Sequence, residues 1–238
     1  MTGFDGKVAV VTGGCGGIGQ AIMAALNSAG ARAIALDVQP APAGLTAISC
    51  DVRDDASVGA AIASVHSQHG RLDFLVHAAG ISRDAVVWKL PVEDWDRILA
   101  INLRGAFLLL RHAVPLMRQQ GGGRAVLIGS INGSRGKFGT SAYSASKAGL
   151  LGLAKSVARE TGRFQVLVNV IEPGWVRTPL TEATPQPIRD AALAETLVGS
   201  LVEPADVANA VLYLCGPGGA RITGQLLRVD AGQYLGAY

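Results

Sequence analysis

The sequence predicts an α/β fold in which one doubly wound, seven-stranded and mostly parallel sheet carries helices on both faces. Three observations predict it. Short β-branched apolar runs alternate with longer stretches of helical spacing, no linker interrupts them, and 49% of the 238 residues are hydrophobic while only 16% are charged. Such alternation is typical of parallel strands joined by right-handed crossovers, and the apolar content suffices for one large core. We therefore expect a single domain over residues 1–238.

The first half of the chain is expected to supply four strands. Residues 7–12 (KVAVVT) are a β-branched apolar run, as in a buried parallel strand. Residues 18–29 then show the apolar spacing of a helix that stops at Gly30. Further strands are expected at 32–37, 46–50 and 72–76, with a helix over 54–69.

The second half is expected to supply the longer helices. Pro91 opens a helix that runs to about residue 117, with its apolar side formed by Trp95, Ile98, Leu99, Leu103 and Phe107. Strands at 125–128, 166–171 and 226–229 alternate with helices at 141–161 and 204–214. The segment from 177 to 202 is richer in Pro, Thr and Ala, so we expect a less regular substrate lid near 178–202.

Composition and charge exclude several classes of function. The formal charge is only +3 and the basic residues are scattered, which disfavours nucleic-acid binding. Cys15, Cys50 and Cys215 lie too far apart in sequence for a disulfide framework or a zinc motif, so no metal is expected and a reducing compartment fits. We see no signal peptide and no apolar run of the roughly 18 residues that suggest a membrane span. The expected location is the cytoplasm.

A glycine-rich loop, TGGCGGIG at 12–19, follows the first predicted strand and precedes a helix. Glycines there permit a sharp turn and a close approach of a pyrophosphate, and the helix N-terminus attracts the anion. An ordinary turn is the alternative for a loop of this kind taken alone. Asp37 ends the second strand, 18 residues beyond Gly19, where a carboxylate binds the ribose hydroxyls of NAD and repels the 2′-phosphate of NADP. We therefore expect NAD, with NADH preferred over NADPH.

Tyr143 and Lys147 are four residues apart on one predicted helix, so they lie on one face. A phenol with a pKa of about 10 is a poor base at neutral pH, and lowering that pKa by about three units needs roughly 4 kcal/mol. The charge of Lys147 and the positive nicotinamide ring are the expected sources. Ser130 ends the fifth strand, where it can hold the substrate oxygen. Asn102 lies near an apolar helix face, where its amide either bonds backbone or holds a water that relays protons from Lys147.

These motifs, in this order and over essentially the full chain, resemble the short-chain dehydrogenase/reductase family in its compact, single-domain branch. The resemblance implies a Rossmann-type fold and an Asn102–Ser130–Tyr143–Lys147 catalytic tetrad, with Asp51 and Val52 at the adenine and 173–178 on the nicotinamide side. The cofactor-binding residues expected are Gly13, Cys15, Gly17, Ile18, Gly19, Asp37, Asp51, Val52, His77, Ala78, Gly80, Tyr143, Lys147, Pro173, Val176 and Thr178.

Two positions depart from the family pattern. The family commonly has NNAG after the fourth strand, whereas this chain has HAAG at 77–80. His77 either contacts the cofactor or is a packed, hydrogen-bonded core histidine. Glu172 stands where small or apolar residues are common, and it faces solvent, pairs with an arginine or touches the pocket.

The substrate pocket is expected to involve Ser130, Asn132, Phe138, Tyr143 and Trp175, near Ile81. The expected pocket residues are mostly apolar or neutral, and only Arg83 and Arg135 are candidates to bind a substrate carboxylate. We therefore favour a neutral or hydrophobic pair of ketone and secondary alcohol.

One rival is reduction of a 3-oxoacyl group on an acyl carrier protein, which many relatives perform. Those enzymes often carry basic residues before the fifth strand to dock the acidic carrier. Here that stretch, 119–123, is flanked only by Arg118 and Arg124, and such enzymes usually prefer NADPH, against Asp37. A non-catalytic NAD-binding sensor is a second rival, disfavoured by the complete tetrad. The resemblance also implies a dimer or tetramer formed through the two long helices and the last strand, and we expect a homotetramer.

Overall fold

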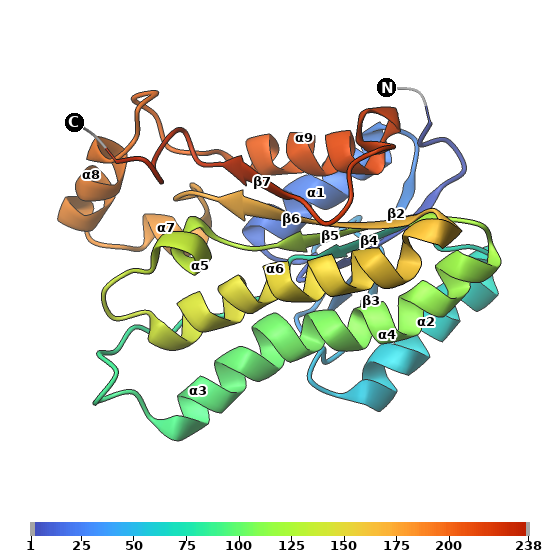
Figure 1. Ribbon diagram of the computed structural model, residues 1–238, viewed down its shortest axis with the longest axis horizontal. Coiled ribbons are helices and arrows are strands. Elements are labelled where there is room, and N and C mark those ends of the chain that lie inside the picture. Colours follow the sequence, from blue (N-terminus) through green and yellow to red (C-terminus); the bar gives the residue numbers. More distant parts are fainter. Residues whose placement is uncertain (1–2, 237–238) are drawn as a thin grey trace.

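A computed structural model describes residues 3–236 of the chain. Its centre is a parallel sheet of seven strands in the order β3-β2-β1-β4-β5-β6-β7 (Figure 1). The strands are β1 (Val8–Thr12), β2 (Arg32–Asp37), β3 (Ala47–Ser49), β4 (Phe74–His77), β5 (Gly123–Ile128), β6 (Val166–Pro173) and β7 (Leu226–Val229). The strand order reverses direction between β1 and β4, which makes the doubly wound topology that the sequence predicts.

Helices cover both faces of this sheet. They are α1 (Gly17–Ser28), α2 (Asp55–His69), α3 (Val92–Leu99), α4 (Gly105–Gln119), α5 (Ile131–Arg135), α6 (Ser141–Thr161), α7 (Pro179–Glu182), α8 (Gln186–Ala194) and α9 (Pro204–Cys215). Figure 1 shows α1 and α9 above the sheet and α2, α4 and α6 below it, while α5, α7 and α8 gather beyond the ends of the strands. The expected Rossmann-type, single-domain architecture is confirmed.

Alternation along the strands divides the core into two layers. In β1, Val8 and Val10 pack with the α2, α4 and α6 side, and Ala9 and Val11 pack with α1 and α9. Successive strand residues point to opposite faces, so a strand buried on both sides reads as a continuous apolar run. That is why VAVVT is both short and entirely buried.

The helix expected over residues 91–117 is interrupted. A π-helical turn at Ala100–Arg104 separates α3 from α4, and sequence spacing gives no sign of it. Phe107, expected on the apolar side, is 45% exposed on the outer surface of α4. Turns of this type are frequent at functional sites, and Asn102 lies within this one.

The expected lid is more regular than predicted, because it contains α7 and α8. Its two ends are joined: Arg177 donates its backbone N–H to Val202, and Val202 donates to Trp175, over 2.8 and 3.2 Å. The residues between these bonds project past the carboxyl ends of the strands (Figure 1).

Within residues 3–236, one helical stretch, Val92–Gln119, is long and apolar enough to cross a membrane by length and composition alone. This stretch includes the buried Leu109 and Met117, which pack in the core against the sheet. A core helix of this kind passes the same test, so the stretch is weak evidence for a membrane span.

Candidate active site

The candidate site lies at the carboxyl edge of the sheet, where the loops after β1, β2 and β4 border one cleft of about 880 Å³. Parallel strands end at the same edge, so residues far apart in sequence meet there. Eleven of the expected cofactor-binding residues line the cleft: Gly13, Cys15, Gly17, Ile18, Gly19, Asp37, Asp51, Val52, Ala78, Gly80 and Thr178. The sequence prediction missed others, among them Gln20, Arg53, Arg97, Ile101, Pro179 and Pro204.

The glycine loop has room for backbone and nothing more. Gly13 has φ +65°, and a Cβ atom there would lie 2.8 Å from the backbone of Ala79. A Cβ on Gly19 would lie 2.0 Å from the carbonyl oxygen of Gly13. Helix α1 begins at Gly17 with no side-chain cap and no acidic residue in its first turn, so its N–H groups are open to an anion.

Asp37 is held against this loop by two backbone donors. Its carboxylate accepts from the N–H of Cys15 over 3.0 Å and from the N–H of Gln39 over 3.0 Å. A carboxylate has further lone pairs, so Asp37 can still accept from a ligand that enters the cleft. Burial, and next the charge of Asp37, raise the pKa of the Cys15 thiol. The negative charge of the Asp37 carboxylate lies where the sequence expects the ribose.

His77 lies outside the lining of the cleft, as the packed core histidine that was the second alternative. Its side chain is 0% exposed, Nδ1 lies 2.9 Å from the hydroxyl of Thr12, and Nε2 lies 3.2 Å from the carbonyl oxygen of Asn102. Burial, and next the charge of Lys147, lower the pKa of His77 to about 3. Because a carbonyl only accepts, the proton sits on Nε2 and the ring is a neutral bridge between β4 and the π-helical turn.

Pro173 and Val176, also expected at the cofactor, lie outside the lining of the cleft. Both residues are buried, Val176 with 5% exposure. Val176 packs in the core against the α1 and α9 layer. In this stretch it is Thr178, the N-cap of α7, that reaches the cleft.

The catalytic candidates meet directly behind this cleft. Lys147 is buried in α6, and its Nζ donates to the carbonyl oxygen of Ile128 over 2.7 Å. It lies 5.7 Å from the centre of the Tyr143 ring and 3.3 Å from where a Cβ of Gly80 would be. Gly80 lines the cleft, so its missing side chain brings Lys147 to the cofactor side. Ser130 follows β5 and caps α5, accepting from the N–H of Asn132 over 3.2 Å.

Both the nitrogen and the oxygen of the Asn102 amide form hydrogen bonds within the protein. This agrees with the first alternative considered above, in which the amide bonds backbone. Its Nδ2 donates to the carbonyl oxygen of Ile81 and to the hydroxyl of Ser146, and its Oδ1 accepts from the N–H of Ile81. Ser146 in turn donates to the carbonyl oxygen of Tyr143 over 2.7 Å. Asn102 therefore joins the loop after β4 to the catalytic helix, and Ser146 is a positioning residue that sequence reasoning missed.

The protein alone does not produce the expected acidic phenol. Burial raises the pKa of Tyr143 above its ordinary value, an effect that the Ser130 side chain counteracts and Asp84 reinforces. Burial lowers the pKa of Lys147 to about 8, so its ammonium persists at neutral pH. Because Nζ of Lys147 bonds the carbonyl oxygen of Ile128, burial of the phenol remains the largest effect on the pKa of Tyr143.

On the substrate side, the structure changes two expectations. Phe138 is 85% exposed and does not pack into a pocket. Arg135, considered as a clamp, donates to the carboxylate of Glu195 over 2.9 Å and to the carbonyl oxygen of Gln233 over 3.0 Å. Arg83 pairs with Asp94 over 2.8 Å. Neither arginine is left without an acidic partner.

Trp175 and the nearby Glu172 are fixed by long-range bonds that spacing cannot predict. Trp175 donates its N–H to the side chain of Gln233 over 2.7 Å, and Lys137 stands 5.2 Å from the centre of its ring. Glu172 is 2% exposed and pairs with Arg228 over 3.2 Å, while Ser134 donates to its other oxygen. Of the three alternatives for Glu172, pairing with an arginine is the one observed.

Comparisons with known proteins find similarity along nearly the whole chain. Residues 13–233 match the family described as enoyl-(acyl carrier protein) reductase. A 3-oxoacyl-acyl-carrier-protein reductase of Escherichia coli K12 is 36% identical, over 98% of this chain and 99% of the relative. The acetoacetyl-CoA reductase of an Acinetobacter strain is 35% identical, over 96% and 98%. The solved structure of a Mycobacterium ulcerans short-chain type dehydrogenase/reductase superposes with a TM-score of 0.92, at 31% identity, over 98% of this chain and 91% of that one.

Proposed function

Because this chain belongs to the short-chain dehydrogenase/reductase family of oxidoreductases, we propose that it reduces the 3-oxo group of an acyl thioester to a secondary alcohol with NADH. The observation that carries the proposal is that Tyr143, Ser130 and buried Lys147 lie together behind the cleft. The glycine loop of this cleft has no space for side chains. The substrate class is the one named for the full-length relatives above. It is a special case of the ketone and secondary alcohol pair expected from the sequence.

The cleft fits a nicotinamide dinucleotide on its own residues. The loop at Gly13 and Gly19 forms a cradle that a Cβ atom would fill, and the uncapped start of α1 offers N–H groups to a pyrophosphate. Asp37 is placed to accept from ribose hydroxyls, and a 2′-phosphate beside it would meet an uncompensated carboxylate. We therefore propose a preference for NADH, although relatives of this kind usually prefer NADPH.

The residues of this chain manage the proton and the substrate oxygen. Ser130 donates to the carbonyl oxygen and polarises it, and Tyr143 transfers its phenolic proton to that oxygen as the alcohol forms. When bound, the reduced nicotinamide supplies hydride to the carbonyl carbon, and its oxidised form adds a positive charge near the phenol. Lys147 contributes a buried ammonium that favours the phenolate left behind.

A neutral substrate end agrees with the substrate side of the site. Arg135 and Arg83 are already paired with Glu195 and Asp94, so neither is free to bind a substrate carboxylate. The lid also carries exposed apolar side chains, namely Ile188, Leu193, Leu197 and Val198. Such residues suit the hydrocarbon part of an acyl group.

The structure adds a second basic residue to the stretch before β5 that the sequence analysis considered for an acidic carrier. Arg118 and Arg163 both stack on Phe164, at 4.2 and 4.6 Å from the ring centre. Sequence reasoning counted Arg118 and not Arg163, which lies far along the chain. Together they present two cations beside the start of β5. The pair lies at the amino edge of the sheet, away from the candidate active site, so it does not decide between a carrier-bound substrate and a free ketone.

The proposed assembly and location rest on the family resemblance of the sequence. Phe107 is 45% exposed on α4, which leaves it available for contact with a second copy. We propose a homotetramer of a cytoplasmic enzyme, with no nucleic acid and no membrane as partner. Sedimentation that gives a monomer at micromolar concentration would contradict the tetramer.

The test is NADH oxidation with a 3-oxoacyl-CoA, the same acyl chain on an acyl carrier protein, a simple ketone of equal length and a trans-2-enoyl-CoA. We expect both 3-oxoacyl thioesters to be reduced, and NADH to give a higher kcat/KM than NADPH. Tyr143→Phe should abolish turnover, whereas Tyr213→Phe, on the exposed side of α9, should leave it unchanged.

Other outcomes identify the alternatives. Equal reduction of the simple ketone supports a general carbonyl reductase, and turnover of the enoyl thioester alone supports the reaction in the family description. Tight NADH binding without turnover of any substrate would support the sensor.

A further inference from the structure

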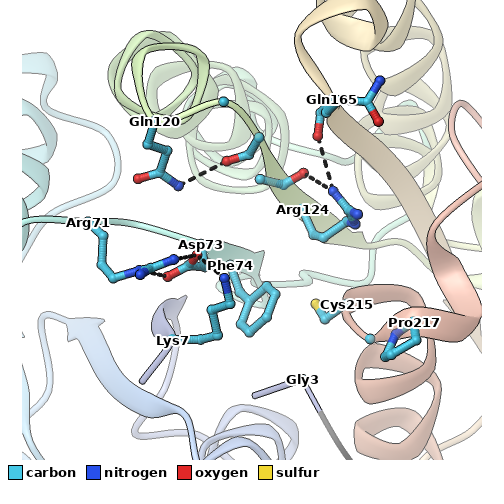
Figure 2. A pocket seen from close by; sticks show the side chains of 14 residues that line it. Gly3, Lys7, Arg71, Asp73, Phe74, Gln120, Arg124, Gln165, Cys215 and Pro217 are labelled. Atoms are coloured by element: carbon cyan, nitrogen blue, oxygen red, sulfur yellow. Dashed lines mark hydrogen bonds and ion pairs between the residues drawn. The ribbon is translucent and has the colours of Figure 1, made fainter. Parts of the chain in front are cut away.

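A second pocket opens at the amino edge of the sheet, on the far side from the candidate active site. It has a volume of about 360 Å³ and is bordered by Lys7, Arg71, Asp73, Arg124, Gln165 and Cys215 (Figure 2). These residues precede or begin β1, β4, β5 and β6, or end α9. None of the groups that carry the proposed reaction lies here, because those groups follow the carboxyl ends of the strands.

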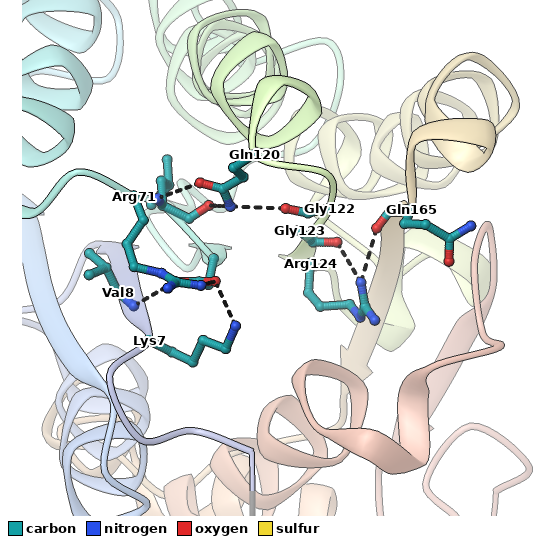
Figure 3. Close-up of polar contacts among 10 residues, drawn as sticks. Lys7, Val8, Arg71, Gln120, Gly122, Gly123, Arg124 and Gln165 are labelled. Atoms are coloured by element: carbon teal, nitrogen blue, oxygen red, sulfur yellow. Dashed lines mark hydrogen bonds and ion pairs between the residues drawn. The ribbon is translucent and has the colours of Figure 1, made fainter.

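The pocket holds more positive than negative charge. Arg71 donates to Asp73 through Nε and Nη2, over 2.7 and 2.6 Å, and Lys7 donates to the same carboxylate over 3.1 Å (Figure 3). Asp73 thus neutralises one of three cations. The third, Arg124, has no acidic partner within 4.0 Å among residues 3–236.

Arg124 is the least compensated of the three. Its Nη1 donates to the carbonyl oxygens of Gly123 and Gln165, over 2.9 and 3.1 Å, while its buried Nε has no hydrogen-bond partner within the described chain. Burial lowers the pKa of this guanidinium and raises the pKa of the neighbouring Cys215 thiol to about 12, so the thiol is neutral and offers no counter-charge. A half-buried cation without an anion is unfavourable unless something supplies one.

We propose that this pocket binds a small organic anion, through a carboxylate or phosphate group placed against Arg124 and Lys7. The planar guanidinium matches both groups in geometry and charge. The volume lies near the lower end of the range for small-molecule sites, and glycines at 121–123 and 216 leave the rim open to a ligand. A bound anion would restore neutrality that Asp73 provides only in part.

The competing explanation is that Arg124 only braces the two backbone carbonyls that it bonds. The two explanations differ in what happens when an anion is added. A brace needs no ligand, whereas a binding site gains stability from one by mass action.

The experiment is a thermal denaturation series with inorganic phosphate or succinate, at constant ionic strength balanced with sodium chloride. We expect one of these anions to raise the melting temperature by roughly 5 °C in a saturable manner. Arg124→Gln should lose this rise. Arg159→Gln, which removes an exposed charge from α6 outside the pocket, should keep it. Which anion acts distinguishes phosphate from carboxylate.

Lys7→Gln keeps the result interpretable if Arg124→Gln does not fold. We expect this variant to shift the titration midpoint to a several-fold higher anion concentration. Absence of a saturable rise with either anion would overturn the proposal. So would an equal rise in Arg124→Gln and Arg159→Gln, because an anion on the glycine loop would survive both changes. None of these readouts depends on the proposed enzymatic activity.

Discussion

The cofactor wall and the substrate wall of the candidate active site differ in how tightly their residues are held. The cofactor wall is the glycine loop with Asp37 and Gly80, where an added Cβ at Gly13 or Gly19 would overlap backbone. The substrate wall is the Lys137–Phe138 loop, Trp175 and the lid, where Phe138 is 85% and Val198 is 72% exposed. Packing therefore dictates the residues of the first wall and leaves those of the second free to vary.

The two walls therefore differ in how narrowly they define a ligand. A glycine loop without space for side chains leaves its backbone N–H groups to a ligand, which suits the pyrophosphate of a dinucleotide. The substrate wall is held only at a few points, chiefly the Arg135, Glu195 and Gln233 bonds. Its exposed apolar side chains suit an acyl group without specifying its length.

The largest effect is expected at Lys147, which lies between Gly80 of the cofactor wall and the ring of Tyr143. Lys147→Met removes the buried ammonium and keeps the length of the side chain, so kcat should fall by ~100-fold or more. Stability should not fall, because the charge is buried without an acidic partner. Lys155→Met, on the exposed side of the same helix, is the control. Retained activity in Lys147→Met would remove Lys147 from the mechanism.

Adding one carbon atom to the glycine loop should weaken NADH binding strongly. Gly19→Ala places a Cβ 2.0 Å from the Gly13 oxygen, so we expect NADH affinity to fall by roughly 10- to 100-fold, or about 1–3 kcal/mol. Gly152→Ala in α6 meets no atom within 4 Å and should leave binding unchanged. Fluorescence titration with NADH measures both. Equal affinity in the two variants would show that the loop is not the cofactor cradle.

The pH dependence of kcat/KM reports the same lysine in the free enzyme. Because burial lowers the pKa of Lys147 to about 8, its ammonium is present below that pH and is lost as the pH rises through it. We expect kcat/KM for ketone reduction to be level at neutral pH and to fall about tenfold per unit well above pH 8. A level profile up to pH 10 would contradict this account.

A smaller effect is expected where the substrate wall is tied to the lid. Arg135→Ala removes the bonds to Glu195 and Gln233, which should loosen the lid and raise KM by about 3- to 10-fold with little change in kcat. Arg221→Ala, which removes an exposed arginine outside the lid, is the control. A lowered kcat with unchanged KM would place Arg135 in the chemistry instead.

The smallest effect is expected at Phe138. Since this side chain is 85% exposed, Phe138→Ala should change the free energy of unfolding by no more than about 0.5 kcal/mol. Any change in KM should appear with long acyl chains and not with short ones. A large loss of stability in urea denaturation would mean that Phe138 is covered, for instance by a second copy of the chain.

Most of the fold could be predicted from the sequence because local patterns determine it. The helix at 141–161 and the strands at 32–37 and 226–229 have the bounds that their periodicity predicts. The π-helical turn and the five-residue α5 could not be predicted, since neither is long enough to show a period.

In the candidate site, too, only residues that belong to local patterns could be predicted from the sequence. Glycines and Asp37 are recognisable because a motif needs them at fixed spacing, whereas the bridge made by His77 joins Thr12 to Asn102 across 90 residues of chain. The Glu172–Arg228 pair spans 56 residues. Such contacts depend on tertiary packing, and no local sequence pattern predicts them.

The central claim is that Tyr143 becomes a proton donor and acceptor near neutral pH only when the dinucleotide completes the charge around it. Ultraviolet difference titration of the phenol, with Tyr143→Phe as the baseline, tests this directly. The account predicts ionisation above the ordinary value of 10.0 in the protein alone and well below that value with NAD⁺ bound. An ionisation that is the same with and without NAD⁺ would contradict it.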